Sequence, residues 1–454
     1  MGTGEEAMGT HVNYLSAGAR NNKKRDSNGS EKKFDRDGKL RVIIIGGSVA
    51  GLCCAHALLR SGVCRVMVLE KAKSLTDAGT GLAIDQLSCQ AFEEWGLRDS
   101  LFRMSKTLDS EENRAIDKEK KVFVTLSRDE EFRHRAIHWS DLHRILYDSL
   151  PSGIAQFGHE AVSFEENKDG SFVRVSISVT REAGDGQPEV FKELHGDVIV
   201  AADGSMSRTT QFFLPNETRR YSGYCAWSGV VDCANEPKLY EAVKRAYPEI
   251  GETMYFELAQ GSHAVIYELK GKMLNWLWYV NMPEPDFQGD SSIKQPDREA
   301  IAAMHEEADR TWMPALAKVM KLSPRPFING IYDKDPVKQL AWRRVVLVGE
   351  AAHPTTLHAS RGTNMSVVDA CVLGKAFQRW GPNNVSSALS EYESARLPTI
   401  SQQLLFCRYI GQLKQGMLFE PRGSFPWPTA DYSMLQGLLL KNMNFFQWRN
   451  RQKG

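Results

Sequence analysis

Three groups of residues in this chain combine glycines or acids with a preceding run of apolar residues. The first is a glycine turn at 46–51 (GGSVAG), with Glu70 further on. The second is Asp203 with the glycine after it, and the third joins Glu350 to the segment 361–364 (RGTN). Glycines let a backbone approach phosphate groups, and carboxylates accept hydrogen bonds from sugar hydroxyls. These groups therefore suit the binding of a nucleotide.

The first group needs a strand before it and a helix after it, and the sequence predicts both. Residues 39–46 contain a short continuous apolar run, typical of a parallel strand covered on both faces. A helix is expected to begin in the glycine turn and to run to about Ser61, and a second buried strand at 64–70 (CRVMVLE) ends in Glu70. This strand-helix-strand unit can receive a pyrophosphate at the N-terminus of its helix.

The residues of this unit have separate expected roles. Gly46 permits the tight turn, Gly51 permits close packing of helix on strand, and Glu70 is placed to accept hydrogen bonds from an adenosine ribose. Ser48 departs from the usual glycine and brings a hydroxyl donor toward the phosphates, and an acid at 70 favours a free 2′-hydroxyl, as in FAD or NAD. The alternative is a turn without a ligand. We assign to this site Gly46, Ser48, Val49, Ala50, Gly51, Glu70 and Lys71.

The other two groups also follow predicted buried strands. The run at 196–202 ends in Asp203, and the run at 343–348 enters Gly349 and Glu350, before a helical pattern that reaches Trp380. Open α/β sheets bind ligands at such strand ends, so Asp203 is expected to face a nucleotide. The equal alternative is that Asp203 is a turn residue that caps a helix. Glu350 could hold a chain of sugar-like hydroxyls, and the amides of 362–364 would offer a positive helix start to an anionic ring edge.

The composition is that of an ordinary globular protein. The chain has 454 residues, 42% of them hydrophobic and 25% charged, enough for two interlocked domains. Lysine and arginine total 57 against 56 acidic residues, so no basic field is available to bind nucleic acid, and small molecules are the expected partners. The eight cysteines show no CxxC spacing, which favours buried free thiols, and we predict no metal site.

The two ends of the chain bear on its location. Residues 1–38 lack the apolar core of a signal peptide, carry too many acids for a transit peptide, and are predicted to be disordered. No run approaches the roughly 20 apolar residues that span a bilayer. Residues 434–448 could form a partly apolar helix, docked on the body or in weak contact with a membrane. We expect a cytoplasmic protein, monomeric or homodimeric.

The order of the three groups carries a resemblance to a known family. The trio GGSVAG, VIVAADGSMSR and VVLVGEAAHP resembles the FAD-dependent monooxygenases of the para-hydroxybenzoate hydroxylase type, over roughly residues 40–398. Residues 79–82 (GTGL), the helix start expected at Trp139 and residues 389–398 (LSEYESARLP) agree with it. Within this superfamily, residues 221–231 (YSGYCAWSGVV) and 274–281 (LNWLWYVN) look like the 2,6-dihydroxypyridine 3-hydroxylase branch and its plant relatives.

The resemblance implies FAD as the cofactor and NADPH or NADH as a donor that docks transiently. It also implies that oxygen adds to the reduced flavin as a C4a-hydroperoxide, whose distal oxygen passes to an electron-rich substrate. By this resemblance Asp203 would lie near the FAD pyrophosphate and the donor, Glu350 would bind the ribitol, and residues 362–364 would lie against the isoalloxazine. The flavin-site residues assigned in this way are Gly81, Asp203, Gly349, Glu350, Arg361, Gly362, Thr363 and Asn364.

Several positions depart from the family pattern, mostly in the loop expected beside the isoalloxazine. Trp139 stands where many members carry an arginine that contacts the flavin, and Arg361 could compensate for it or be a solvated loop cation. The remaining departures are Glu350 for aspartate, Leu357 for proline, Ser360 and Arg361 for Gly-Gln, and Val368 for glutamate.

The middle of the chain changes to an antiparallel pattern. Strands are expected at 253–258, 264–269 and 273–280, with a helix near 298–318. Alternation along 275–279 sends Trp276 and Trp278 to one face of the sheet and Asn275, Leu277 and Tyr279 to the other, and one face should line a substrate pocket. Aromatic residues in a sheet are more often core than ligand contacts, which is the alternative for each candidate. The pocket candidates are Tyr224, Trp227, Tyr255, Tyr279 and His358, of which Tyr224, Tyr279 and His358 are also the catalytic candidates, while His353 is expected to shape the loop.

These patterns predict an α/β fold: a Rossmann-like FAD-binding domain of the GR2 flavoprotein type, interleaved with an antiparallel substrate domain and followed by a helical region. The expected boundaries are 39–214 and 336–380 for the FAD-binding domain, 215–335 for the substrate domain and 381–454 for the helical region. The predicted activity is NAD(P)H- and O2-dependent hydroxylation or epoxidation of a small aromatic, heteroaromatic or isoprenoid-like metabolite. The alternatives are a flavin-dependent oxidase or halogenase, and an FAD-binding protein without turnover.

Overall fold

The structure is a computed structural model that describes residues 37–75, 79–116, 123–167, 170, 172–179, 190–287 and 291–418. The expectations for the chain before Asp37, and for a helix at 434–448, lie outside these residues. None of the helices in the described ranges is long and apolar enough to cross a membrane.

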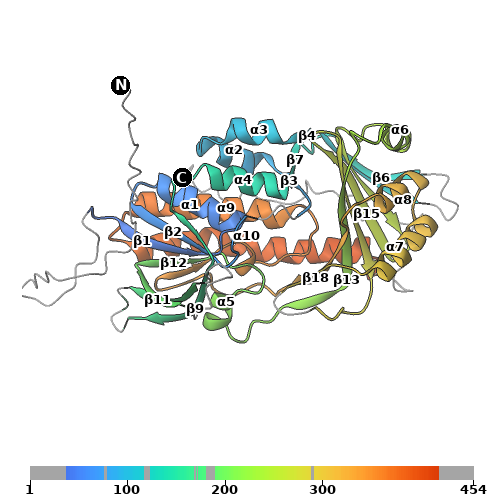
Figure 1. The fold of residues 1–454 in the computed structure, drawn as a ribbon. Helices are drawn as coiled ribbons and strands as arrows, with labels where there is room; N and C mark the ends of the chain where they lie inside the picture. Colours follow the sequence, from blue (N-terminus) through green and yellow to red (C-terminus); the bar gives the residue numbers. More distant parts are fainter. Residues whose placement is uncertain are drawn as a thin grey trace, which may run out of the picture.

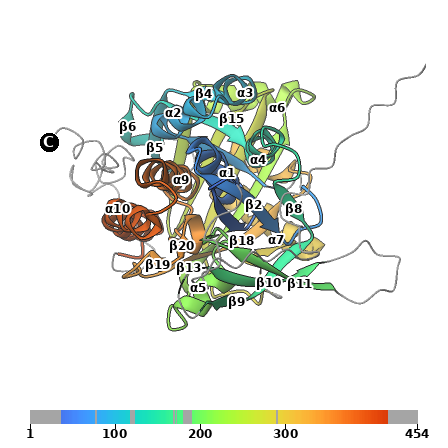
Figure 2. The same cartoon turned by 90° about the vertical axis from the view of Figure 1, so that its left-hand side faces the viewer.

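One half of the molecule is built on a six-stranded sheet with the order β19-β20-β12-β1-β2-β8 (Figures 1 and 2). All its strand pairs are parallel except the edge pair β19–β20. The predicted strand-helix-strand unit is confirmed, because β1 is followed by helix α1 and then by β2. The strands are β1 (Leu40–Ile45), β2 (Cys64–Glu70), β8 (Ala155–Phe157), β12 (Val198–Ala201), β19 (Ala341–Trp342) and β20 (Val345–Leu347).

Both faces of this sheet are covered, as its continuous apolar strands require. Val42 and Ile44 of β1 pack on the side of helices α1 (Val49–Arg60) and α9 (Arg361–Trp380). Ile43 and Ile45, which alternate with them, pack against the antiparallel sheet β11-β10-β9. The strands of this second sheet are β9 (His159–Glu166), β10 (Val173–Val179) and β11 (Val190–Gly196).

The other half of the molecule is an eight-stranded sheet with the order β17-β18-β13-β16-β15-β14-β5-β6 (Figure 1). Its pairs are antiparallel except β14–β5. The three strands expected from the sequence are confirmed as β14, β15 and β16, whereas β5 and β6 come from the segment assigned to the FAD-binding part. The strands are β5 (Ser110–Ile116), β6 (Phe123–Asp129), β13 (Arg220–Asp232), β14 (Thr253–Ala259), β15 (Ser262–Leu269), β16 (Met273–Asn281), β17 (Ile293–Lys294) and β18 (Phe327–Asp333).

The helix predicted at 298–318 is two helices, α7 (Arg298–Thr311) and α8 (Pro314–Lys321). Pro314 explains the break, because proline lacks an N–H donor and pushes the preceding residue into an extended conformation. Met313 indeed has ψ 148°. Together with α6 (Pro237–Ala246), these helices pack residues such as Trp312 and Leu239 into the core on one face of the eight-stranded sheet.

Smaller elements and one long helix connect the halves. The sheet β3-β7-β4 and helices α2 to α4 lie over the join, and α10 runs from beside α9 to the eight-stranded sheet (Figures 1 and 2). The remaining elements are β3 (Gly81–Ile84), α2 (Gln86–Glu94), α3 (Arg98–Met104), β4 (Lys106–Leu108), β7 (His134–His138), α4 (Trp139–Asp148), α5 (Arg208–Phe213), a 3-10 turn at Gly349–Ala351 and α10 (Val385–Lys414).

Candidate functional site

A cavity of about 180 Å³ lies at the carboxyl ends of β1, β2 and β12. Three adjacent parallel strands end here, so the residues that follow each strand meet although they are far apart in sequence. The glycine turn, Glu70 and Asp203 are thereby brought together as predicted. The lining residues assigned from the sequence are Gly46, Ser48, Glu70, Lys71 and Asp203, and they are joined by His159, Gly204 and Arg208.

The glycine turn is packed more tightly than any side chain would allow. Gly46 has φ +103°, and a β-carbon there would lie 2.2 Å from the carbonyl oxygen of Ala202. A β-carbon on Gly51 would lie 1.9 Å from the carbonyl oxygen of Gly46. Both expected roles, the tight turn and the close packing, are therefore seen. Ser48 caps α1 without a side-chain hydrogen bond, so its hydroxyl does not occupy the first-turn amides of the helix.

Glu70 has a structural role that sequence reasoning did not identify. Its Oε2 accepts a hydrogen bond from the amide of Gly47 at 2.7 Å, and its Oε1 accepts one from the amide of Ala72 at 2.7 Å. Because an ionised carboxylate can accept about four hydrogen bonds, the side chain keeps capacity for a ribose hydroxyl. It therefore holds the glycine turn in place at the edge of the cavity that it lines.

Asp203 combines the two readings that the sequence left open. Its carboxylate accepts hydrogen bonds from the Ser207 hydroxyl at 2.6 Å and from the amide and hydroxyl of Thr209, each at 3.1 Å. These contacts organise the start of α5, as a capping residue would. Burial raises the pKa of Asp203, against the opposing effect of these donors. The residue also lines the smaller cavity.

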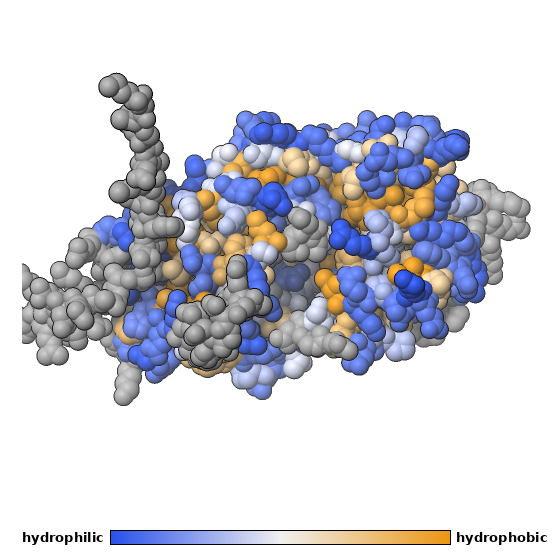
Figure 3. Space-filling model, in the orientation of Figure 1, coloured by the Kyte–Doolittle hydropathy of each residue, from blue (hydrophilic) through white to orange (hydrophobic). Residues whose placement is uncertain are grey.

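A second cavity of about 500 Å³ lies between the two halves of the molecule. Figure 3 shows hydrophobic residues on both sides of a hollow in the middle of this face. On one side it is bounded by β3 and the start of α9, and on the other by the eight-stranded sheet. The lining residues assigned from the sequence are Gly81, Tyr279, Glu350, Arg361, Gly362 and Thr363. Trp139, Leu357 and Ser360, which depart from the family pattern, also line the cavity.

The helix α9 begins at the cavity with an unusual backbone. Ala359 and Ser360 have φ +64° and +53°, the left-handed region that favours glycine. This conformation costs roughly 1–2 kcal/mol per residue. It gives a physical reason for the glycine that the family resemblance places at position 360. Ser360 is the N-cap and makes no side-chain cap, and Gly362 and Thr363 of the first turn of α9 line the cavity.

Arg361 is not the solvated loop cation that was one reading of the sequence. The residue is 5% exposed, and its Nη1 lies 3.8 Å from a carboxylate oxygen of Asp85. Burial lowers the pKa of Arg361 to about 10, with Asp85 opposing, so it remains a cation at pH 7. The structure thus places a buried positive charge at the wall of the larger cavity.

Asn364 is tied to the protein rather than open to the cavity. Its side chain accepts a hydrogen bond from the amide of Asp85 at 3.1 Å and donates to the carbonyls of Ala83 and Ser360 at 2.9 and 2.7 Å. These bonds join α9 to β3 and hold the left-handed turn. Any contribution of Asn364 to ligand binding therefore comes from its backbone.

Gly349 and Glu350 are positioned by a buried ionic cluster. Asp369 accepts hydrogen bonds from the Gly349 amide at 2.9 Å, from His353 at 2.6 Å and from Arg396 at 2.7 Å. Burial alone would raise the pKa of Asp369, but His353 and Arg396 outweigh it and lower the pKa to about 2. His353 is fully buried in this cluster, as expected of a residue that shapes the loop. Glu350 instead lines the larger cavity, where its side chain is exposed, and the loss of hydration caused by the surrounding protein raises its pKa.

The register of the eight-stranded sheet produces the opposite wall of the larger cavity. Phe256 pairs with Val265, Val265 with Leu277, Leu277 with Ser228 and Ser228 with Phe327. One row of side chains thus crosses five strands, and all five of these residues line the cavity. The row is apolar except for one hydroxyl, which suits a flat apolar ligand.

Only one of the three catalytic candidates lines this cavity. Tyr279 does so, and its hydroxyl donates to the carbonyl of Leu357 at 3.3 Å. Behind it, His263 stacks on the Tyr279 ring at 4.2 Å and lies 3.3 Å from Nε2 of His358. Burial lowers the pKa of His358 to about 3, with Lys414 adding to the effect. His358 and Tyr224 differ from the prediction: both are buried beneath α10, because that helix covers this part of the sheet.

Trp227 and Tyr255 also differ from the prediction as pocket residues. Both lie on the opposite face of the sheet, in the core under α6, α7 and α8, together with Trp276 and Trp278. The predicted split of residues 275–279 between the two faces is confirmed. Side chains alternate between the two faces along a strand. Trp227 and Tyr255 fall on the helix-covered face because each is one residue away from a cavity residue, Ser228 in β13 and Phe256 in β14.

Tyr267 is a cavity residue that sequence reasoning missed. It lines the larger cavity and pairs with Asn275 across the sheet. Burial raises the pKa of this phenol, so it remains a donor at neutral pH. Alternation along β15 could have found it, because Val265 and Tyr267 share a face. The other missed lining residues include Ser228, Met254, Phe256, Val265, Asn329 and Phe327.

The two cavities together fit a long dinucleotide better than a single small ligand. The smaller one offers the uncapped start of α1 and two acids, which suit a pyrophosphate and a ribose. The larger one offers the uncapped start of α9 beside a buried cation, which suits the anionic edge of a planar ring. Glycine packing at Gly46 and Gly51 leaves no room for side chains where the phosphates would lie. FAD has this combination of parts.

Comparison with known proteins gives the same cofactor. The model of a family described as "FAD binding domain" matches residues 39–406. The chain is 28% identical over 372 residues to the 3-amino-4-hydroxybenzoate 2-monooxygenase of Streptomyces platensis, which covers 80% of this chain and 85% of that protein. It is 24% identical over 383 residues to a salicylate hydroxylase of Pseudomonas putida, which covers 79% of this chain and 82% of that protein.

Solved structures show the same fold. A salicylate hydroxylase with bound substrate superposes with a TM-score of 0.70 at 21% identity, over 90% of this chain and 95% of that one. The 2,6-dihydroxypyridine-3-hydroxylase of Arthrobacter nicotinovorans superposes with a TM-score of 0.69 at 19% identity, over 87% and 98%. The family match spans both halves of the molecule and all three groups of residues from which the sequence was first interpreted. The chain therefore belongs to the FAD binding domain family and is an FAD-dependent monooxygenase.

Proposed function

We propose that this enzyme uses NAD(P)H and O2 to hydroxylate a small, flat aromatic or heteroaromatic substrate held against the eight-stranded sheet. The observation that carries the proposal is the larger cavity, about 500 Å³, with the uncapped start of α9 on one side and the apolar row from Phe256 to Phe327 on the other. Two relatives act, by name, on 3-amino-4-hydroxybenzoate and salicylate. Both compounds are single aromatic rings that such a wall could hold.

The flavin site is proposed from the residues that line the two cavities. The start of α1, with Gly46, Ser48, Val49, Ala50 and Gly51, would hold the pyrophosphate, with Glu70 and Lys71 at the adenosine end and Asp203 beside the phosphates. Glu350 would accept hydrogen bonds from the ribitol. When bound, the flavin supplies the redox chemistry and the activation of oxygen. At the isoalloxazine end, the assigned residues that line the larger cavity are Gly81, Arg361, Gly362 and Thr363, and the assigned residues behind its wall are Gly349 and Asn364.

Arg361 would supply the positive field that this chemistry needs. A buried cation at the wall stabilises negative charge in the adjacent ring system, and the same site in a low-dielectric cavity makes that interaction stronger than it would be in water. In this role Arg361 would replace the arginine that the family resemblance places at Trp139. Trp139, stacked on His143 at 4.6 Å, closes the edge of the cavity instead.

The substrate would be oriented by hydroxyl groups on an otherwise apolar wall. Tyr267 and Tyr279 reach the cavity from the adjacent strands β15 and β16, and Ser228 reaches it from β13, on the other side of β16. The apolar side chains around them exclude water, which protects reactive oxygen species from premature breakdown. His358 would act only through Tyr279, because it lies behind that ring.

The test is the visible spectrum of the purified protein before and after anaerobic NADPH addition, followed by aerobic turnover with salicylate and with 3-amino-4-hydroxybenzoate. We expect flavin bands that bleach with NADPH, faster NADPH consumption with one of these aromatic compounds, and ¹⁸O from ¹⁸O2 in the product. Hydrogen peroxide with oxidised but not oxygenated product would indicate an oxidase. Bound flavin that neither NADPH nor NADH reduces would indicate an FAD-binding protein without turnover.

We also propose that the enzyme works in the cytoplasm as a monomer or homodimer. All eight cysteines lie in the described part of the chain, and none of them forms a disulfide. Free buried thiols suit a reducing compartment. Cell fractionation and light scattering of the purified protein test the two parts of this proposal.

A further inference from the structure

A small side pocket opens beside the larger cavity. Its volume is about 60 Å³, more than the roughly 15 Å³ that one water needs. It shares Ser292, Asn329, Glu350, Thr355 and Leu357 with the larger cavity, so a ligand in one could extend into the other. The residues that belong to the side pocket alone are Ser205, Arg219, Gly330, Ile331, Tyr332 and Pro354.

Arg219 is the cation that lines this pocket, and among the described residues no carboxylate forms an ion pair with it, although Glu350 shares the pocket and is near enough for its pKa to be lowered by Arg219. Its Nη1 is buried and has no hydrogen-bond partner among the described residues. Its neighbour in sequence behaves in the opposite way: Arg220 donates to both oxygens of Asp333, at 3.0 and 2.9 Å. Arg219 is half-buried, so the cost falls on this one buried N–H group, which loses hydration without gaining a hydrogen-bond acceptor. The difference between the two arginines suggests that Arg219 meets its acceptor in a ligand.

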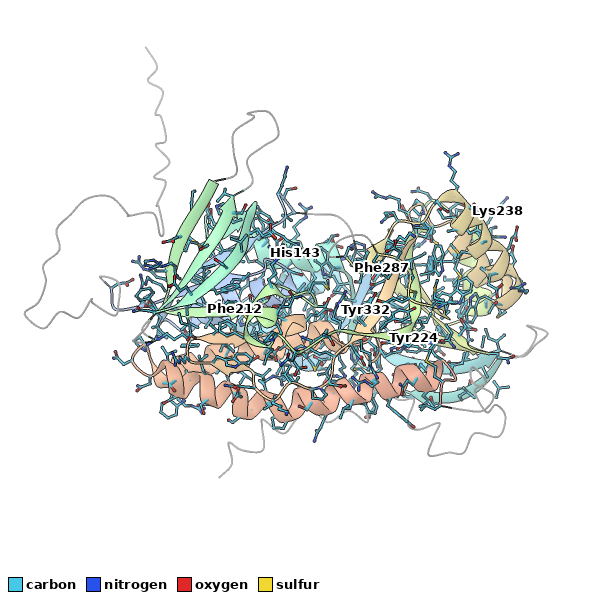
Figure 4. The ribbon with its side chains drawn as sticks, turned by 90° about the horizontal axis from the view of Figure 1, so that it is seen from below. His143, Phe212, Tyr224, Lys238, Phe287 and Tyr332 are labelled. Carbon is cyan, nitrogen blue, oxygen red and sulfur yellow. The ribbon has the colours of Figure 1, made fainter. Side chains whose placement is uncertain are left out.

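The side chain of Arg219 is held in position for such a ligand. Its guanidinium lies over the ring of Tyr332, with its carbon 4.2 Å from the ring centroid. Figure 4 shows Tyr332 in the middle of the molecule, between the two halves. Stacking on an aromatic face leaves the edge of the guanidinium available for in-plane hydrogen bonds, the geometry that recognises carboxylates and phosphates.

The other charged groups nearby leave room for an anion. Glu350 lines the same pocket, but it also faces the larger cavity, where the proposed ribitol hydroxyls would occupy it. Lys334, which is 5% exposed, adds a second buried cation: burial lowers its pKa and Arg219 adds to this effect, while Glu217 and Asp203 oppose it. Asn329 offers a side-chain oxygen without a donor, so a ligand with an N–H or O–H beside its anionic group would satisfy both residues.

We propose that this side pocket is an oxyanion subsite in which Arg219 binds the carboxylate of the organic substrate or a phosphate of the nicotinamide donor. Both groups present two or more coplanar or adjacent oxygens to a guanidinium edge. The inference rests on the proposed function for the identity of the two reactants. Its test measures binding without turnover, so it can fail while the monooxygenase activity stands.

The experiment compares FAD-loaded wild-type protein with Arg219→Gln, Arg219→Lys and the control Arg220→Gln. Asp333 remains paired with Arg408 in the control, at 2.6 Å, so that variant removes one positive charge without leaving the carboxylate unpaired. Dissociation constants for benzoate and for its neutral isostere benzamide come from flavin difference spectra and calorimetry. The dissociation constant for NADPH comes from the concentration dependence of anaerobic flavin reduction. Thermal unfolding checks that each variant is folded.

If the anion is a substrate carboxylate, Arg219→Gln weakens benzoate binding about 10-fold or more, abolishes the preference for benzoate over benzamide, and leaves NADPH unchanged. If it is a donor phosphate, NADPH weakens by a similar factor and benzoate does not. Arg219→Lys should retain part of the affinity, and Arg220→Gln should stay within about two-fold of wild type. Equal affinities of wild type and Arg219→Gln for all three compounds, or no binding by the wild type, would overturn the proposal.

Discussion

The two faces of the eight-stranded sheet are built from the same strands, yet one is a core and the other a binding wall. On the face under α6, α7 and α8, Trp227, Trp276 and Trp278 are buried among helix side chains. On the other face, Ser228 and Leu277 occupy the neighbouring positions and line the larger cavity. At the middle of β13 and β16, tryptophans fill the covered face, whereas Ser228 and Leu277 leave space on the open face. In these two strands the tryptophans therefore mark the core, and the residues one position along from them form the binding wall.

Replacement of Trp276 by alanine should have the largest effect on stability. Its side chain is fully buried and its indole N–H donates to Ser323 at 2.5 Å, so the change leaves a cavity and removes this hydrogen bond. We expect a loss of about 3–5 kcal/mol in the free energy of unfolding. Urea unfolding measures it.

The matched variant is Leu277→Ala, one position along the same strand. Part of its side chain already faces a cavity, so the expected loss is about 2 kcal/mol, at the low end for such changes. If both variants lost the same free energy, the two faces would not differ as described.

Filling the open face should impair substrate binding without unfolding the protein. Leu277→Trp puts an indole into the middle of the central row, in a cavity of about 500 Å³ that has room for it. We expect kcat/KM for the aromatic substrate to fall about 100-fold, equivalent to about 2.7 kcal/mol, with flavin content unchanged. Steady-state kinetics and the flavin absorbance of the same samples measure both. A variant with wild-type kcat/KM would show that the substrate lies elsewhere.

Acid should destabilise the open face through its buried histidines. Burial lowers the pKa of His358 to about 3 and that of His263 well below its ordinary value of 6.5. The unfolded chain therefore binds more protons than the folded one below pH 6.5, so stability is present above this pH and is lost as the pH falls. The expected slope is up to about 1.4 kcal/mol per pH unit for each histidine.

The variant His358→Gln isolates one part of this slope. Urea unfolding between pH 6.5 and 4.5 should show a dependence on pH that is weaker than wild type by up to about 1.4 kcal/mol per unit. Identical slopes for the two proteins would mean that His358 is accessible to protons in the folded state.

The smallest effects should come from two tyrosines on adjacent strands and opposite faces. The hydroxyl of Tyr267 faces the cavity, so Tyr267→Phe should raise KM for the substrate up to about 10-fold with little change in stability. The hydroxyl of Tyr255 accepts a hydrogen bond from the Glu249 amide at 3.2 Å, so Tyr255→Phe should cost about 1 kcal/mol of stability and leave KM unchanged. Kinetics and thermal unfolding of both variants test this assignment. If Tyr255→Phe raised KM and Tyr267→Phe lost stability instead, the assignment of the two tyrosines to the two faces would be wrong.

The nucleotide-binding half could be predicted from the sequence because its signals are local. A glycine turn between a strand and a helix, with an acid at the end of the next strand, is a continuous pattern of residues 40–70. The structure confirmed the elements and brought Glu70 and Asp203 to one cavity. The hydrogen bonds of Glu70 to the turn were not predictable, because they depend on side-chain geometry.

The binding wall could be predicted only in part, because it depends on pairing between distant strands. Alternation correctly separated Trp276 from Leu277, but it cannot say which face a helix will cover. Tyr224 was therefore chosen although α10 buries it, and Tyr267 was missed although its position in β15 is equivalent in phase to Val265. Arg219 was missed for a different reason: its neighbour Arg220 looks identical in sequence, and only their partners distinguish them.

The 30 residues of α10 constrain how a substrate can reach the cavity. At 1.5 Å per residue the helix is roughly 45 Å long, and it spans both halves of the molecule (Figure 1). Pro398 is the position where this helix would bend most easily, but Arg396, two residues earlier, forms a hydrogen-bonded ion pair with Asp369. A hinge rotation of one half against the other would have to bend the helix or break this ion pair. Entry of the substrate should therefore depend on local loop motion, on the nanosecond to microsecond scale, rather than on slower domain opening.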